Sequence, residues 1–135
     1  MLRGDFLEKT VSTIKGLKKG GFVLIDDAPC RVEKVAISSS GKHGASKAKV
    51  DAIGLLDGKR RSIVKPASEN VDVPIIIKKN SQILAIIGER VQLMDLTDFS
   101  VFELDIPEEM KGTLKPGTEI PYFEIVGIKT IKQIK

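Results

Sequence analysis

The apolar residues of this chain are dominated by β-branched side chains, and this constrains its fold more than any other feature. The 135 residues include 17 isoleucines and 11 valines, whereas aromatic residues make up only 4% and tryptophan is absent. β-Branched side chains lose rotamer freedom in helices and pack well on the pleated surface of a sheet. The composition therefore predicts a fold built mainly from β-strands.

The first half of the chain has the pattern of a meander of short strands. Apolar or alternating runs separated by turn-forming residues occur at residues 22–26, 30–37, 47–52 and 61–65. The apolar positions of the second run change phase near Glu33 and Lys34, which predicts a β-bulge there. Asp57 and Gly58 supply a tight turn before the last run. Bent strands of this kind are typical of small barrels.

The second half is also predicted to be β. Five strand candidates follow at short spacing, at residues 82–87, 91–96, 101–106, 119–126 and 128–134. A helical turn is expected at residues 107–112, where Pro107 begins it and Gly112 ends it. Five strands with a helical turn at this point fit an OB-type barrel. Pro74 cannot donate to a sheet ladder, so we place a domain boundary near it, giving domains 1–72 and 73–135.

The N-terminus shows a different pattern. Leu7, Val11 and Ile14 recur at the spacing of a helix face, and Asp5 with Glu8 resembles a capping arrangement. This pattern favours a helix before the first strand.

Charge is distributed unevenly along the chain. Residues 1–72 carry 14 basic and 9 acidic side chains, whereas residues 73–135 carry 8 basic and 9 acidic ones. A basic first domain favours a polyanionic partner, although a modest excess of lysine is also common on ordinary protein surfaces.

The loop from Ser38 to Lys47 carries the strongest functional signal. It contains no apolar residue larger than Ala45, so it contributes little to a core. Gly41 and Gly44 flank Lys42 and His43, and their backbone freedom favours a sharp tip from which Lys42 projects. Such a cation can approach phosphate groups, while the alternative is a plain solvated hairpin tip.

The sequence does not match the known catalytic and metal-binding motifs. The Gly-Lys pair lacks the first glycine and the Ser or Thr of a P-loop, because Ala36 and His43 stand at those positions. A serine hydrolase would need an orienting carboxylate, and nothing in the sequence fixes one beside His43. His43 is the single histidine, which argues against a zinc site of the usual composition, and the single cysteine, Cys30, cannot form an internal disulfide. We therefore predict a protein that is not an enzyme and that holds no metal. No run of residues is apolar enough for a membrane span or a signal peptide, so a cytoplasmic location is expected.

The loop and several flanking segments resemble a known family. The run Gly41-Lys42-His43-Gly44, followed by residues 47–50, is similar to the modified loop of archaeal and eukaryotic translation initiation factor five-A, the relative of bacterial elongation factor P. Further similar segments occur in the family's order, at residues 17–20, 25–30, 73–76, 82–86 and 91–96. The resemblance extends from about Leu17 to the end, and the short loops look archaeal.

The resemblance implies a fold and a role. The expected fold is an SH3-like barrel followed by an OB-fold. Lys42 is expected to receive an aminobutyl group from spermidine, added by deoxyhypusine synthase, to give deoxyhypusine or hypusine, with Gly41, His43 and Gly44 forming the modification loop. The family binds the ribosome, contacting rRNA and the acceptor end of peptidyl-tRNA, where the modified side chain helps slow peptide bonds form. Apart from the spermidine-derived group, no cofactor, membrane or small-molecule substrate is implied.

Other cations are candidate RNA contacts. We predict this role for the basic residues that follow the loop, namely Lys47, Lys49, Lys59, Arg60 and Arg61. For each of them an ordinary solvated side chain is an equally good interpretation. Ser39 and Ser46 depart from the family pattern, where lysine and alanine are usual, and these changes bear on recognition by the synthase. The alternative function is an unmodified RNA-binding or ribosomal protein made of two small barrels.

Overall fold

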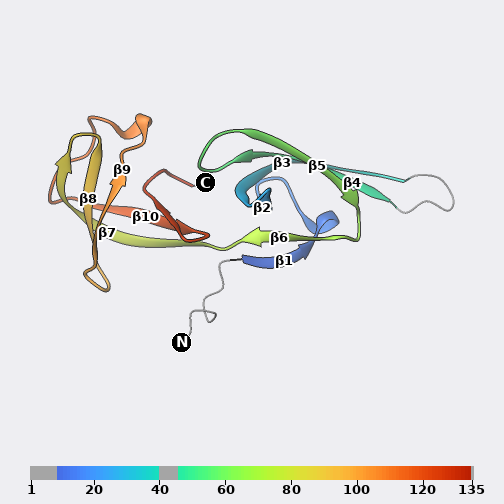
Figure 1. Cartoon of the computed structure of the whole chain (residues 1–135), viewed down its shortest axis with the longest axis horizontal. Coiled ribbons are helices and arrows are strands. Elements are labelled where there is room, and N and C mark those ends of the chain that lie inside the picture. The colour runs from blue at the N-terminus through green and yellow to red at the C-terminus, as the bar shows by residue number, and fades with distance from the viewer. Residues whose placement is uncertain (1–8, 40–45, 135) are drawn as a thin grey trace. The chain divides into compact units, whose positions relative to one another are not determined.

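The computed structural model describes residues 9–39 and 46–134, and within these ranges the chain is built almost entirely of β-strands (Figure 1). It divides into two compact units, Met1–Ile75 and Ile76–Lys135. The expected boundary after Asp72 lies within strand β6 (Asn70–Pro74). No helix in the described ranges is long and apolar enough to cross a membrane. The fold is all-β, as the sequence predicted.

Four strands of the first unit form one antiparallel meander that curls on itself. In their order across the sheet they are β2 (Phe22–Ile25), β3 (Ala28–Ser38), β4 (Lys47–Gly54) and β5 (Arg60–Pro66). A separate ribbon is formed by β1 (Lys9–Thr13) and β6, and the short 3-10 helix η2 (Ile14–Gly16) follows β1. The curled sheet and this ribbon make up the SH3-like barrel.

The core of the first unit lies on the inner face of the curled sheet. Along β4, Ala48, Val50 and Ala52 are buried, whereas Lys47 and Lys49 are exposed. Successive side chains of a strand point to opposite faces of a sheet, so a strict alternation of this kind determines which face is exposed to solvent. The alternation read from residues 47–52 is therefore confirmed.

Strand β3 contains the expected bulge. Val32 pairs with Ala52 and Lys34 pairs with Asp51, so Glu33 is an extra residue in the ladder. The insertion lets Val32 and Val35 both pack against the core although three positions separate them. The change of phase in the sequence therefore correctly predicted this β-bulge.

The sequence predicted a helix at the N-terminus, and this prediction is wrong for the residues of that segment that the structure describes. Residues 9–13 form β1, which pairs with β6 from Lys9 opposite Pro74 to Thr13 opposite Asn70. Three of these five residues are β-branched, and β6 offers a ladder, so strand pairing outweighs the helical spacing. Val11 is 60% exposed, and the buried Ile14 follows β1 as the first residue of η2. Leu7 lies outside the described residues.

The second unit is a five-stranded sheet that nearly closes into a barrel. Across the sheet the order is β11 (Ile128–Thr130), β10 (Glu119–Ile125), β7 (Ile76–Ile87), β8 (Arg90–Asp95) and β9 (Val101–Asp105). The two edge strands, β9 and β11, come into contact. The expected helical turn is the 3-10 helix η3 (Glu108–Met110) between β9 and β10. This is the OB-fold.

A buried polar contact ties β8 to β10 within this barrel. The hydroxyl of Tyr122 donates a hydrogen bond to the carboxylate of Asp95, which is only 3% exposed. The same carboxylate accepts the backbone N–H groups of Thr97 at 2.7 Å and Asp98 at 3.0 Å, so it also shapes the turn after β8. Asp95 is thus a single anion stabilised from three directions.

Candidate functional site

The loop with the strongest sequence signal is carried by the β3–β4 hairpin. The two strands remain paired up to Ser38 opposite Lys47. Near the end of the loop, the carbonyl of Ser46 accepts a hydrogen bond from the backbone N–H of Ala67 at 2.8 Å. Residues 40–45, and with them Gly41, Lys42, His43 and Gly44, lie outside the described residues, so their roles stay predictions. What the structure provides is a long, well-paired support on both sides of the loop.

Lys47 and Lys49 lie on the outer face of the sheet beside this loop. Each is flanked across the sheet by small or apolar residues: Ser38 and Pro66 beside Lys47, and Ala36 and Val64 beside Lys49. Directly opposite residues of antiparallel strands share a face, so no carboxylate stands in these two rows. Neither lysine forms an ion pair with any described residue. Both side chains remain available to a partner.

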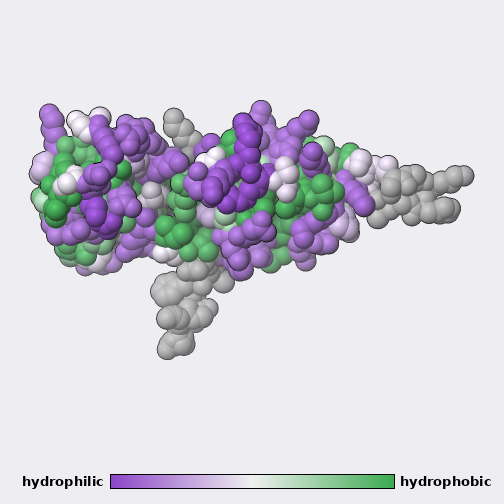
Figure 2. Space-filling model, turned by 45° about the horizontal axis from the view of Figure 1, so that its top comes forward, coloured by the Kyte–Doolittle hydropathy of each residue, from purple (hydrophilic) through white to green (hydrophobic). Residues whose placement is uncertain are grey.

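Arg60 is the first residue of β5, and Lys59 comes directly before it. Arg60 is opposite Ile53 of β4, so it shares the outer face with Lys49. Its guanidinium is 3.6 Å from the carboxylate of Glu33, and with 78% of the side chain exposed this pair contributes little to stability. In Figure 2, strongly hydrophilic side chains gather over the region of β5.

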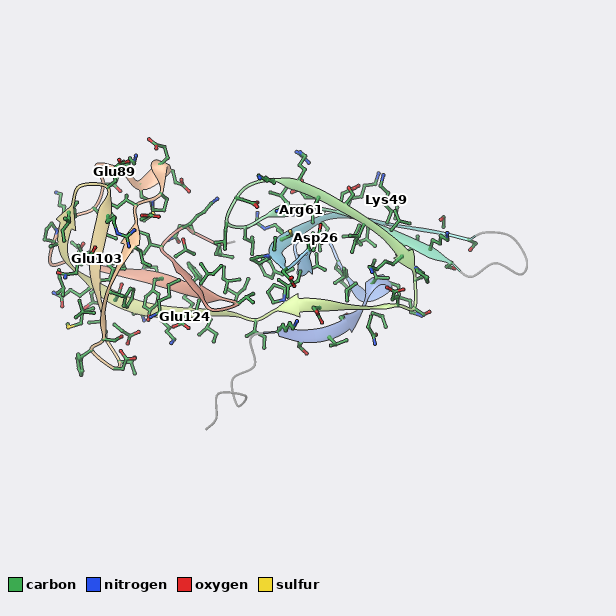
Figure 3. The ribbon with its side chains drawn as sticks, in the orientation of Figure 1. Asp26, Lys49, Arg61, Glu89, Glu103 and Glu124 are labelled. Atoms are coloured by element: carbon green, nitrogen blue, oxygen red, sulfur yellow. The ribbon has the colours of Figure 1, made fainter. Side chains whose placement is uncertain are left out.

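Arg61 occupies the opposite face from the other predicted contacts. Its partner in β4 is the buried Ala52, and Figure 3 shows Arg61 within the curve of the sheet and Lys49 on its outside. Two nitrogens of the guanidinium bind both oxygens of Asp57, at 3.1 and 2.8 Å. A bidentate pair of this kind fixes the side chain in one orientation. An RNA contact of Arg61 remains a prediction, but its guanidinium already stabilises the fold through Asp57.

The Arg61–Asp57 pair closes the turn between β4 and β5. The hydrogen bond from Arg61, together with the backbone N–H of Lys59, lowers the pKa of the Asp57 carboxyl below its usual range. A Cβ placed on Gly54 would lie 2.0 Å from an oxygen of Asp57, so only glycine fits under this pair. Nearby, Cys30 is fully buried, and this burial raises the pKa of its thiol. The thiol therefore packs in the core, as expected from its lone position.

Comparison with known proteins decides the family. Residues 9–69 match a family model described as translation initiation factor 5A-like, N-terminal. The chain is 50% identical over 119 residues to translation initiation factor 5A of Methanocella arvoryzae, covering 88% of this chain and 93% of that protein. The chain belongs to the translation initiation factor 5A family. Its similarity to the factor of Thermococcus sibiricus is 47% over 132 residues, covering 95% of this chain and 96% of the relative.

The solved structure of the Methanococcus jannaschii factor has the same fold as this family member. The two superpose with a TM-score of 0.85 at 38% identity, covering 93% of this chain and 95% of the other. The expectation that the chain is a translation factor and not an enzyme is confirmed by the family to which it belongs.

Two cations on the outer face were not among the predicted contacts. Arg31 lies opposite Ile53, and Lys34 lies opposite Asp51, so both share the face of Lys49. The sequence contained a signal for the face of Lys34, because the predicted bulge at Glu33 shifts the pairing of the residues that follow it by one position. Assigning a face to Arg31 and Lys34 also required the register between β3 and β4, which the pattern of β3 alone does not supply.

Proposed function

We propose that this member of the family is a ribosome-binding factor that promotes peptide-bond formation and relieves stalling during elongation, and in initiation as well. Its functional group is Lys42, carrying the deoxyhypusine or hypusine side chain and reaching the acceptor end of peptidyl-tRNA. The observation that carries the proposal is the paired β3–β4 hairpin, which supports the Gly41-Lys42-His43-Gly44 loop and places exposed cations beside it. The factor acts in the cytoplasm, where it meets the ribosome and deoxyhypusine synthase.

The modification gives Lys42 properties that an ordinary lysine lacks. The Nζ atom of Lys42 forms a new bond to the aminobutyl carbon of spermidine, the C–N bond of spermidine breaks, and the remaining diamine leaves with the proton. An unmodified lysine is a compact, strongly hydrated cation with a pKa near about 10.4. The extended side chain has a second amine and a longer reach, so it can contact two sites along a nucleotide backbone.

The factor's contribution to the reaction is positional. Holding the acceptor end of peptidyl-tRNA in its attack geometry removes part of the entropic barrier to peptide transfer. The reacting groups remain those of the ribosome and its tRNAs. Gly41 and Gly44 serve this role by letting the lysine enter first the pocket of the synthase and later a narrow ribosomal channel.

Mass spectrometry of the protein purified from the cells that make it tests the modification. We expect the peptide that contains Lys42 to carry an aminobutyl adduct, with or without one added oxygen. The peptide that contains Lys47 and Lys49 is the internal control and should be unmodified. An unmodified Lys42 in this material would contradict the proposal and favour a plain RNA-binding protein, with Ser39 and Ser46 as the residues to examine.

A further inference from the structure

The edge of β1 that faces away from β6 is unpaired. Strand β1 forms a two-stranded ribbon with β6, and no described strand pairs with its other side (Figure 1). Other edge strands of the described sheets come into contact with a further strand, β9 with β11 and β2 with β5 and β6. An unpaired edge presents backbone N–H and C=O groups to which another strand can pair. The described part of the chain therefore offers β1 as a site for an additional strand.

The register of the ribbon shows which backbone groups of β1 point away from β6. Next to the strand, the N–H of Ile14 donates to the carbonyl of Glu69 at 2.9 Å and so continues the ladder of β1 and β6. Because hydrogen-bonded and non-hydrogen-bonded pairs alternate along antiparallel strands, Thr10 and Ser12 also bond to β6. Pro74, which has no N–H, occupies a position in the ladder where no such bond is needed. The remaining residues of β1 direct their backbone groups outward, namely Lys9, Val11 and Thr13.

Strand β1 lacks the features that usually keep an edge strand from pairing. Proline, a bulge and a charge within the strand are common protections. The segment contains neither proline nor glycine, and its pairing with β6 contains no bulge. Its single charge, Lys9, is at the end of the strand, where the ammonium lies 3.3 Å from the carboxylate of Asp72. At the centre, Val11 is uncharged and 60% exposed. The centre of this edge therefore favours an uncharged strand.

We propose that two copies of this chain pair in antiparallel fashion through β1, about a two-fold axis that places Val11 opposite Val11 of the second copy. In this register the two valines exchange both N–H···O=C bonds, and on each side the N–H of Thr13 meets the carbonyl of Lys9. The side chains agree with this pairing. Lys9 is opposite Thr13, so no like charges face each other, and Thr10 is opposite Ser12, a pair of hydroxyls that stabilises antiparallel strands.

Other symmetry centres within β1 fit less well. An axis at Thr10 or Ser12 would oppose backbone groups that are already bonded to β6. An axis at Lys9 would set two ammonium groups opposite each other. An axis at Thr13 would lie where the strand ends and η2 begins. Val11 is therefore the centre that uses the outward groups along the whole strand.

The paired ribbons form a sheet of four strands in the order β6, β1, β1, β6. An isolated two-stranded ribbon is only marginally stable, and additional strands stabilise a sheet. The contact involves only five residues of each copy, which is small beside the interfaces of permanent dimers. We therefore expect a weak and reversible dimer. This inference goes beyond the proposed function, because it uses neither the loop with Lys42 nor the ribosome.

Disulfide trapping tests the register. The full chain with Val11→Cys is oxidised at high protein concentration and analysed on a non-reducing gel. Residues of a hydrogen-bonded antiparallel pair have Cα atoms about 5.5 Å apart, which suits a disulfide, so a covalent dimer should accumulate. Thr10→Cys is the matched control, because this position is also exposed but its two copies are offset by about 7 Å along the strands; it should remain monomeric. The native thiol of Cys30 is fully buried and does not compete.

Sedimentation velocity over a concentration series measures the association itself. The sedimentation coefficient of the wild type should rise with concentration towards that of a dimer. Val11→Pro removes one outward N–H without removing a bond to β6, and it should weaken association about tenfold or more. Val11→Lys places two ammonium groups opposite each other and should act in the same direction. The control is Val64→Lys, at a valine of β5 that is 58% exposed, and it should associate like the wild type.

The outcomes decide the proposal independently of the proposed function. A wild type that stays monomeric at every concentration would overturn it, as would equal trapping of Val11→Cys and Thr10→Cys. A dimer that neither Val11→Pro nor Val11→Lys weakens would place the interface elsewhere and would also contradict it. Circular dichroism shows whether each variant is folded; should Val11→Pro unfold, Val11→Lys and its control carry the test. None of these results bears on Lys42, whose role is tested by its modification.

Discussion

Replacing Lys42 by arginine should leave the fold intact and abolish the function of the factor. Arginine preserves the positive charge, but its guanidinium does not accept the aminobutyl group. The loop from Ser38 to Lys47 offers no apolar residue larger than Ala45, so the exchange removes no core contact. In a strain depleted of the endogenous factor, we expect Lys42→Arg to give no growth above the empty-vector level.

The matched controls are Lys47→Arg and Lys49→Arg. Both residues are exposed on the same hairpin, and arginine can make the phosphate contacts expected of them. These variants should restore growth, and all three proteins should unfold at the temperature of the wild type. Full complementation by Lys42→Arg would show that modification of this lysine is dispensable.

The largest effect on stability is expected at Asp95. Asp95→Ala removes the acceptor of the buried Tyr122 hydroxyl and of the backbone N–H groups of Thr97 and Asp98. Hydrogen bonds to a charged group contribute more than neutral ones, and a buried hydroxyl without a partner adds a desolvation cost. We expect the free energy of unfolding of the second unit to fall by about 3 kcal/mol.

Urea denaturation followed by tyrosine fluorescence measures this change. Tyr122 is the only tyrosine and tryptophan is absent, so the signal reports on the second unit. The control is Asp98→Ala, which removes an exposed carboxylate bound to the N–H and hydroxyl of Ser100 and should cost less than about 1 kcal/mol. Equal midpoints for Asp95→Ala and Asp98→Ala would contradict the assigned role of Asp95.

The same contact predicts how acid affects the second unit. The hydrogen bond from Tyr122, followed by those from the backbone of Asp98 and Thr97, lowers the pKa of Asp95 from 3.8 to about 2. The folded state therefore binds fewer protons than the unfolded state between these values. The contribution of Asp95 is complete above about pH 4 and is lost as the pH falls towards about 2. The urea midpoint of the wild type should drop more steeply across this window than that of Asp95→Ala.

Much of the first unit could be predicted because its signals are local. The alternation of residues 47–52 and the change of phase at Glu33 each depend on neighbouring residues, and both features occur in the structure. The N-terminal segment shows the limit of such reasoning. Helical spacing and β-branched composition conflict between Lys9 and Thr13, and the conflict is decided by pairing with β6, about sixty residues away in the chain.

The candidate site likewise combines a feature that a local sequence pattern indicates with features that depend on long-range strand pairing. The loop with Lys42 could be identified from the short run Gly41-Lys42-His43-Gly44, whereas the face on which each cation lies depends on strand register. Arg60 and Arg61 are neighbours in the sequence, yet one is opposite Ile53 on the outer face and the other is opposite the buried Ala52. The bond between Tyr122 and Asp95 spans 27 positions, and no local pattern indicates it.

The unbroken pairing of β3 and β4 beyond the bulge limits how the family can change the length of this hairpin. Inserting a single residue into β4 would turn Lys47 and Lys49 inward and bring Ala48 and Val50 to the solvent. Adding two residues to each strand preserves both faces and lengthens the hairpin by about 7 Å. The distance to which the loop extends from the barrel can therefore evolve only in discrete steps, and single insertions should be tolerated within the loop but not in the strands.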